Sequence, residues 1–137
     1  MKPIEASLDS NEPNFKTHLY IDDHHLLADE PEEKGGGELG PTPFQYLAGS
    51  LASCTVITLK MYLNHKGWEY GAVTAKVSRP SDEKGPQNRF DVHVIIEGDF
   101  DDNQWGRLNR VAGRCPVHKV LEHGMEINLH LSPGLQS

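Results

Sequence analysis

The two cysteines of this chain, Cys54 and Cys115, are the residues best suited to chemistry. A thiolate is both a nucleophile and a metal ligand, so a cysteine pair can carry redox chemistry or bind a metal. Residues 1–15 contain no apolar stretch of the kind that forms a secretory signal. We therefore expect a reducing, cytoplasmic compartment, where two cysteines are more often catalytic, metal-binding or inert than a permanent disulfide.

Cys115 directly precedes Pro116, and proline is favoured at the first position of a helix. This order makes Cys115 the predicted N-cap, where backbone N–H groups and the helix dipole favour a thiolate. Arg114 adds a neighbouring cation. Local physics therefore indicates that Cys115 is the better activated thiol, and the alternative is a cap residue chosen for its size. A third, weaker hypothesis makes Cys115 and His118 half of a metal site, although zinc needs three or four ligands.

Cys54 lies in the strongest predicted element, a helix that begins after Thr42. Pro43 fits the first helical position, Gln45 completes a capping box with Thr42, and Gly67 ends the helix. Apolar residues surround nearly the whole circumference, so we expect a sheet to cover one side and a second subunit the other. Cys54 could be a small buried core residue in such a helix.

Composition excludes several classes of partner. The 137 residues fit a single domain, 1–137, with residues 1–12 as a loose tail. The net charge is −7, and the thirteen basic residues form no stripe, so neither nucleic acid nor an anionic membrane is an expected partner. The uncharged run 43–59 is slightly too short to cross a bilayer.

The remaining elements follow from hydrophobic periodicity. Alternating and turn-rich patterns predict strands, a central helix, two further strands, two helices and a last strand, which together make an α+β fold. The predicted strands are 14–21, 26–28, 73–78, 90–97 and 127–131, and loops cover 29–40 and 80–88. One helix begins at Asp101 or Asp102, and another begins after Cys115 and ends at Glu122 or His123.

The segment around Cys54 reads GPTPFQYLAGSLASCTVITLKMYLNHKGW, and the segment around Cys115 reads RCPVHKVLEHG. The first resembles the central helix of the OsmC/Ohr family, and the second resembles that family's second cysteine motif. The preceding loop ADEPEEKGGGELGPTPF is also similar, and the likeness covers residues 14 to 132. The resemblance implies antiparallel sheets wrapped around a long central helix in an intertwined homodimer, with active sites at the subunit interface.

The same resemblance implies an activity. OsmC/Ohr proteins are thiol peroxidases that reduce organic hydroperoxides in oxidative-stress defence, with an external dithiol as reductant and no metal, flavin or haem cofactor. By analogy Cys54 matches the attacking cysteine and Cys115 the resolving one. The family analogy and the local physics thus assign the more reactive thiol differently, and we follow the family.

The chain departs from the family pattern at two activating residues. Phe44 stands where the family has a glutamate, and no arginine precedes Arg79. Lys16 is a candidate substitute cation, while Gln45 is better explained as the capping residue, because it faces away from Cys54 on a straight helix. The alternative function is therefore a small-molecule-binding or stress-associated protein with little or no peroxidase turnover.

Overall fold

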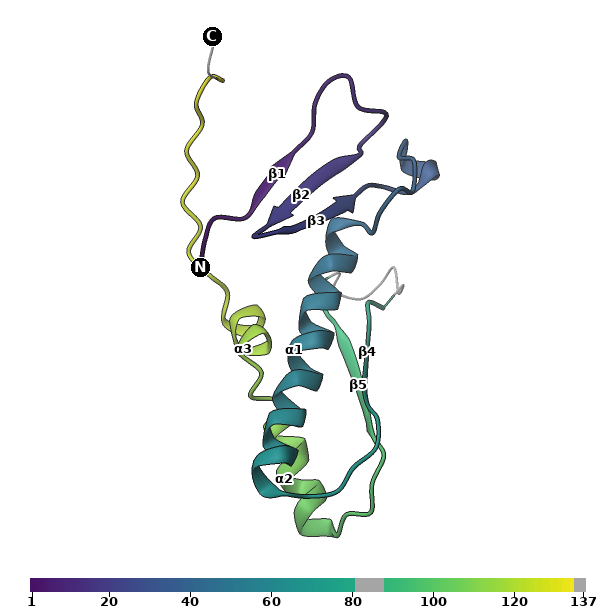
Figure 1. Ribbon diagram of the computed structural model, residues 1–137, viewed down its shortest axis with the longest axis vertical. Coiled ribbons are helices and arrows are strands. Elements are labelled where there is room, and N and C mark those ends of the chain that lie inside the picture. The colour runs from purple at the N-terminus through teal and green to yellow at the C-terminus, as the bar shows by residue number, and fades with distance from the viewer. Residues whose placement is uncertain (81–87, 135–137) are drawn as a thin grey trace. The chain divides into compact units, whose positions relative to one another are not determined.

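The computed structural model describes residues 1–80 and 88–134 (Figure 1). The chain divides into two compact units, residues 1–53 with 76–93 and residues 54–75 with 94–137. Helix α1 and strands β4 and β5 each contribute residues to both units. The α+β class expected from the order of elements is confirmed.

The first unit contains a three-stranded antiparallel sheet with β2 in the middle (Figure 1). Its strands are β1 (Glu5–Ser7), β2 (Thr17–Ile21) and β3 (His24–Ala28). The prediction that residues 1–12 form a loose tail is wrong for Glu5–Ser7, because this segment pairs with β2 as strand β1. The pairing gives it backbone hydrogen bonds that its own sequence pattern does not indicate. The predicted strand 14–21 begins only at Thr17, and its partner begins at His24 rather than at Leu26.

The loop between β3 and α1 contains the short 3₁₀ helix η1 (Glu32–Lys34). Its glycines allow close backbone contacts: a Cβ on Gly36 would lie 1.8 Å from the Glu30 carbonyl oxygen, and one on Gly40 would lie 2.2 Å from that of Leu27. Only glycine fits at these two positions without a shift of the backbone. The glycine-rich loop therefore has a defined conformation.

Helix α1 (Pro43–Lys66) begins and ends as the sequence predicts. Gln45 Oε1 accepts a hydrogen bond from the Thr42 N–H at 2.8 Å, and Thr42 Oγ1 accepts one from the Gln45 N–H at 3.2 Å. These reciprocal bonds form the capping box. Gly67, with φ of 69°, ends the helix in the left-handed region that favours glycine.

The core of the second unit forms where α1 packs against α2 (Asp102–Ala112). Four buried side chains define this core: Leu59, Leu63, Leu108 and Val111. Asp101 caps α2, because its side chain accepts a hydrogen bond from the Gln104 N–H at 2.8 Å. The pattern of apolar residues from Trp105 to Ala112 is thus confirmed as an amphipathic helix.

Strands β4 (Val73–Ser78) and β5 (Asp91–Ile96) pair in a two-stranded sheet. Just outside them, the Gly71 N–H donates to the Glu97 carbonyl and the Glu97 N–H to the Ala72 carbonyl. The start of β4 therefore meets the end of β5, and the strands are antiparallel, as expected. Most of the predicted turn 80–88 lies outside the described residues.

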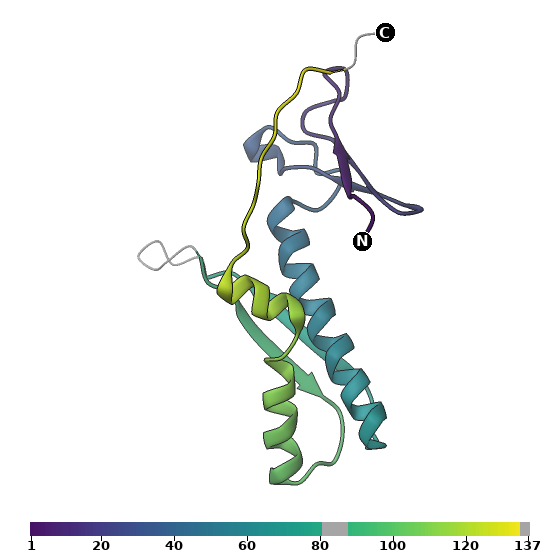
Figure 2. The same cartoon turned by 90° about the vertical axis from the view of Figure 1, so that its left-hand side faces the viewer.

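Helix α3 (Pro116–His123) is followed by an extended segment, coloured yellow in Figures 1 and 2. The predicted strand 127–131 is wrong for this single chain, since residues 124–134 pair with no strand among the described residues. Ile127, Leu129 and Leu131 are 85%, 90% and 96% exposed. An alternating pattern becomes a strand only when a neighbouring strand accepts its backbone hydrogen bonds.

Helix α1 has the length and composition of a membrane-spanning helix, with a mean hydropathy of 1.2 over its most apolar window. The core helix of a soluble protein meets the same criteria. In this chain Leu59 and Leu63 of α1 are completely buried in a core shared with α2. We therefore interpret α1 as a core helix.

Candidate active site

The two cysteines meet inside the second unit. Cys54 lies in the middle of α1 and is half-buried, whereas Cys115 precedes α3 and is 0% exposed. The Cys54 side chain lies close enough to Cys115 to raise the pKa of its thiol, and both cysteines are free. The fold thus brings together the two cysteines that sequence analysis selected.

Cys115 occupies the N-cap position of α3, as predicted. Its backbone is non-helical, with φ of −53° and ψ of 130°, and Pro116 is the first helical residue. Its Sγ accepts a hydrogen bond from the His118 N–H at 3.5 Å, and its carbonyl accepts one from the Lys119 N–H at 3.1 Å. The cap therefore fixes the sulfur at the start of α3.

The protonation of Cys115 differs from the expectation. Burial raises the pKa of the Cys115 thiol, and the hydrogen bond with Cys54 raises it further. The N–H groups of His118 and Val117 lower this pKa, but they do not outweigh burial. The helix cap therefore does not lower the pKa of the Cys115 thiol in this fold, because the effect of burial is larger than that of the backbone N–H groups.

Arg114, the proposed supporting cation, is exposed to solvent. Water and salt screen an exposed charge, so its influence on the buried Cys115 thiol is weak. The Arg114 backbone N–H donates to the Val111 carbonyl at 2.9 Å and so continues the end of α2 toward Cys115. Its structural contribution is therefore made through the backbone.

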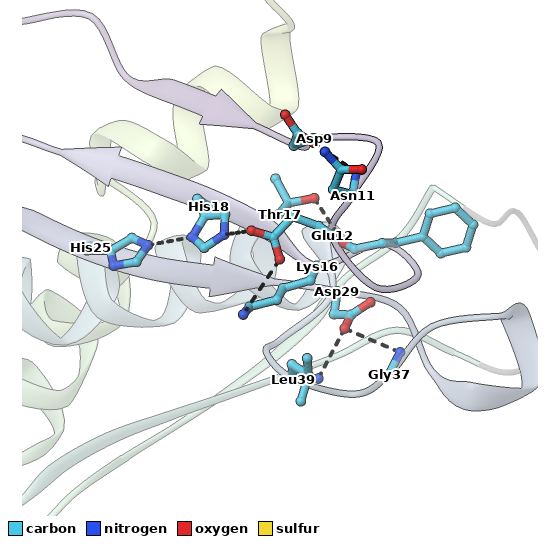
Figure 3. Close-up of polar contacts among 11 residues, drawn as sticks. Asp9, Asn11, Glu12, Lys16, Thr17, His18, His25, Asp29, Gly37 and Leu39 are labelled. Atoms are coloured by element: carbon cyan, nitrogen blue, oxygen red, sulfur yellow. Dashed lines mark hydrogen bonds and ion pairs between the residues drawn. The ribbon is translucent and has the colours of Figure 1, made fainter.

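Lys16 immediately precedes β2 and is already paired. Its Nζ lies 3.7 Å from Glu12 Oε2, and this ion pair is drawn as a dashed line in Figure 3. Glu12 Oε1 also lies 2.8 Å from His18 Nε2, and His18 Nδ1 lies 2.8 Å from His25 Nε2 (Figure 3). The hydrogen bond with His18 lowers the pKa of Glu12, with a smaller contribution from Lys16. Lys16 is thus part of a polar network in the first unit that also includes Glu12, His18 and His25.

Gln45, the other candidate supporting residue, has its side-chain oxygen bound to the Thr42 N–H. That bond is the N-terminal half of the capping box described above. Gln45 therefore stabilises the start of α1, and the capping interpretation of this residue is confirmed.

Two residues that sequence analysis did not select have defined positions in the first unit. Arg79 places its guanidinium 4.2 Å from the centre of the Phe44 ring, a cation–π contact at the position where the family has a glutamate.

Asp29 is buried and binds the loop that leads to α1: its carboxylate accepts hydrogen bonds from the N–H groups of Glu30, Gly37 and Leu39. Figure 3 shows Asp29 directed at Gly37 and Leu39. Neither contact could be derived from sequence spacing.

The hypothesis of a Cys115–His118 metal site finds no ligand set in the described residues. No group of three or more cysteine, histidine or acidic side chains there is arranged to hold a metal ion. His118 Nε2 instead lies 2.6 Å from Glu122 Oε1, one turn along α3. The chemistry that the described part of this site can perform is therefore that of the two thiols.

Comparisons with known proteins place this geometry in a family. The model of the OsmC-like protein family matches residues 35–130, which include both cysteines. No curated protein matches the chain. Among solved structures, the chain resembles a protein from Psychrobacter arcticus 273-4, provisionally described as an osmotic stress induced and detoxification response protein, with a TM-score of 0.72 and 19% identity over 87% of each chain.

Two further solved structures are similar in fold. An OsmC-like protein from Mycoplasma pneumoniae has a TM-score of 0.68 and 20% identity, covering 88% of this chain and 86% of its own. An organic hydroperoxide resistance protein from Elizabethkingia anophelis has a TM-score of 0.56 and 20% identity, covering 88% of both chains.

The fold and site define an α+β protein with two free cysteines close together, one in a long helix and one at a helix N-cap. The family model matches residues 35–130, which are most of the chain. The protein therefore belongs to the OsmC-like family.

Proposed function

We propose that this protein is a thiol peroxidase that reduces organic hydroperoxides, with Cys54 as the attacking and Cys115 as the resolving cysteine. The observation that carries this proposal is the contact between the two thiols together with the raised pKa of Cys115. A resolving cysteine must remain an intact thiol near the attacking sulfur until that sulfur is oxidised, and buried, protonated Cys115 meets this requirement.

In the proposed reaction the Cys54 thiolate attacks the outer oxygen of the hydroperoxide. The O–O bond breaks, an alkoxide leaves and takes a proton to become an alcohol, and Cys54 becomes a sulfenic acid. The Cys115 sulfur then attacks the Cys54 sulfur, so that a disulfide forms and water leaves with the Cys115 proton. An external dithiol reduces the disulfide by thiol–disulfide exchange and returns both thiols.

We propose a cytoplasmic homodimer as the working form. Support comes from apolar side chains that this single chain leaves exposed on α1, since Phe44 is 52%, Ile57 52% and Met61 68% exposed. The alternating segment 127–131 also exposes three large apolar residues. Surfaces of this kind mark interaction sites, and a second copy would cover them without any other partner.

Similar folds support the substrate class. The proteins from Elizabethkingia anophelis and Legionella pneumophila are described as organic hydroperoxide resistance proteins. The alternative, a small-molecule-binding or stress-associated protein with little turnover, is favoured by one observation. The residues that could replace the family's activating pair are engaged elsewhere: Lys16 with Glu12, and Gln45 with Thr42.

A steady-state assay tests the proposal. Cumene hydroperoxide consumption is measured with dithiothreitol as reductant, for the unmodified protein, Cys54→Ser and Cys115→Ser. We expect turnover by the unmodified protein and none by Cys54→Ser above the rate of free dithiothreitol. If the unmodified protein does not exceed that rate, the binding-protein alternative replaces the peroxidase.

A further inference from the structure

An open pocket of about 640 Å³ lies in the second unit, between the end of α1 and the start of α2. Sites that bind small molecules commonly have volumes of about 300–1,000 Å³. Three aromatic rings and three carboxylates line the pocket: Trp68, Tyr70, Phe100, Glu69, Glu97 and Asp99. The lining contains neither of the two cysteines, and it contains no lysine or arginine.

The aromatic wall is held in place by packing against the core of the unit. Trp68 meets Tyr62 edge to face at 5.6 Å between ring centroids, and its ring is tilted by 51° to that of Phe100 at 6.2 Å. A Cβ on Gly98 would lie 2.4 Å from the Phe100 ring, so the ring can occupy this position only because residue 98 is a glycine. The Tyr70 hydroxyl donates to Asn64 Oδ1 at 2.6 Å. These contacts fix the aromatic surfaces before any ligand arrives.

The charge of the pocket is negative, and one carboxylate is fixed. Glu97 Oε2 accepts a hydrogen bond from the Ala72 N–H at 3.0 Å, and a Cβ on Gly71 would lie 2.5 Å from the same oxygen. The glycine thus lets the Glu97 carboxylate fold over the backbone. Glu69 and Asp99 add two charges that are exposed to solvent.

Aromatic rings beside dispersed carboxylates favour an organic cation over a metal ion. A metal needs several ligand atoms converging on one point, and no group of three such side chains in the described residues does so. An alkylated ammonium group instead spreads its charge over a larger apolar volume, which ring faces attract through cation–π interactions. We propose that this pocket binds a small alkylated ammonium compound of the choline type.

Choline chloride is the probe. The full-length protein is titrated at constant ionic strength, set with sodium chloride, while tryptophan fluorescence and heat of binding are recorded. The neutral isostere 3,3-dimethyl-1-butanol, which has the same shape without the charge, is titrated in parallel. We expect saturable binding of choline and none of the alcohol over the same range, because the charge provides the attraction.

Matched variants locate the site. Glu69→Gln and Asp99→Asn are each expected to weaken choline binding about fivefold, since each removes one negative charge from the pocket lining. Glu33→Gln removes the same charge from an exposed position on η1 and should leave the affinity unchanged. Circular dichroism spectra that match the unmodified protein show that the variants are folded.

Three results would overturn the inference: no saturable choline binding, equal binding of the neutral alcohol, or displacement of choline by stoichiometric magnesium. The measurement uses no peroxide and neither cysteine. A negative result therefore leaves the proposed peroxidase activity untouched, and an inactive peroxidase leaves this site untouched.

Discussion

Cys54 and Cys115 are far apart in the sequence but close together in the fold, where burial and then the neighbouring Cys54 side chain raise the pKa of Cys115. Cys54 is carried by the middle of α1, and Cys115 is fixed by the cap of α3. Because Cys115 is completely buried and Cys54 only half-buried, the two sulfurs lie in unequal environments before any substrate arrives. The inequality supports a division of roles in which Cys54 attacks and Cys115 resolves.

The raised pKa of Cys115 predicts a loss of stability in alkali. An unfolded cysteine ionises near pH 8.5, whereas folded Cys115 keeps its proton to higher pH. The folded state binds more protons in that window, so this contribution is complete below the unfolded pKa and is lost as the pH rises through the folded pKa. We expect the free energy of unfolding in urea to fall more steeply above about pH 8.5 in the unmodified protein than in Cys115→Ser. Parallel pH profiles would contradict this.

The lowered pKa of Asp29 predicts that the folded state loses stability in acid. Burial alone would raise the pKa of Asp29, but backbone N–H groups of Glu30, Leu39 and Gly37 bind the carboxylate and lower it. The stabilisation is present above the unfolded pKa of about 3.9 and is lost as the pH falls through the lower folded pKa.

Asp29→Asn should therefore be less stable than the unmodified protein at neutral pH, and the difference should shrink in acid. The measurement is urea unfolding at pH 7 and pH 3, and limited proteolysis should show faster cleavage of the loop 30–40 in the variant. Asp23→Asn, in the exposed turn before β3, is the matched control. Equal effects of the two substitutions would show that Asp29 has no special part in the loop.

The packing of the core of the second unit predicts that truncating one leucine, Leu63, strongly lowers the free energy of unfolding. Leu63 is 0% exposed and packs with Leu59, Leu108 and Val111. Leu63→Ala should lower the free energy of unfolding by about 2–5 kcal/mol, because it removes buried contacts and leaves a cavity. Lys60→Ala, on the exposed side of α1, should change it by less than about 0.5 kcal/mol. A change below about 1 kcal/mol for Leu63→Ala would place this leucine outside the core.

The proposed homodimer predicts that a charge on the exposed apolar side of α1 breaks the assembly. Met61 is 68% exposed in the single chain, so Met61→Glu should fold but elute as a monomer in size-exclusion chromatography with light scattering. Lys66→Glu places a carboxylate near the end of the same helix, on the other side from Ile57, and should leave the dimer intact. A monomeric unmodified protein, or a dimeric Met61→Glu variant, would contradict the proposed dimer.

Local patterns in the sequence were sufficient for features that depend on neighbouring residues. The capping box of Thr42 and Gln45, the end of α1 at Gly67 and the N-cap position of Cys115 all follow from residues a few positions apart. The residue type selected both cysteines, the family resemblance implied their roles, and the fold places them close together.

Features set by distant residues could not be derived in this way. The pKa of Cys115 depends on burial and on Cys54, and neither is encoded in the sequence around the cap. Strand β1 exists because β2 pairs with it, and segment 127–131 has the alternation of a strand but no partner in the described part of the chain. A strand depends on its neighbour as much as on its own residues.

The most direct test of the division of roles is chemical trapping of the sulfenic acid. Cys115→Ser and Cys54→Ser are each treated with one equivalent of cumene hydroperoxide in the presence of dimedone, and the labelled residue is identified by peptide mass spectrometry. We predict that Cys54 is labelled in Cys115→Ser, that Cys115 stays unlabelled in Cys54→Ser, and that the unmodified protein forms the Cys54–Cys115 disulfide instead. Labelling of Cys115 in Cys54→Ser, with Cys54 unreactive in Cys115→Ser, would contradict the account.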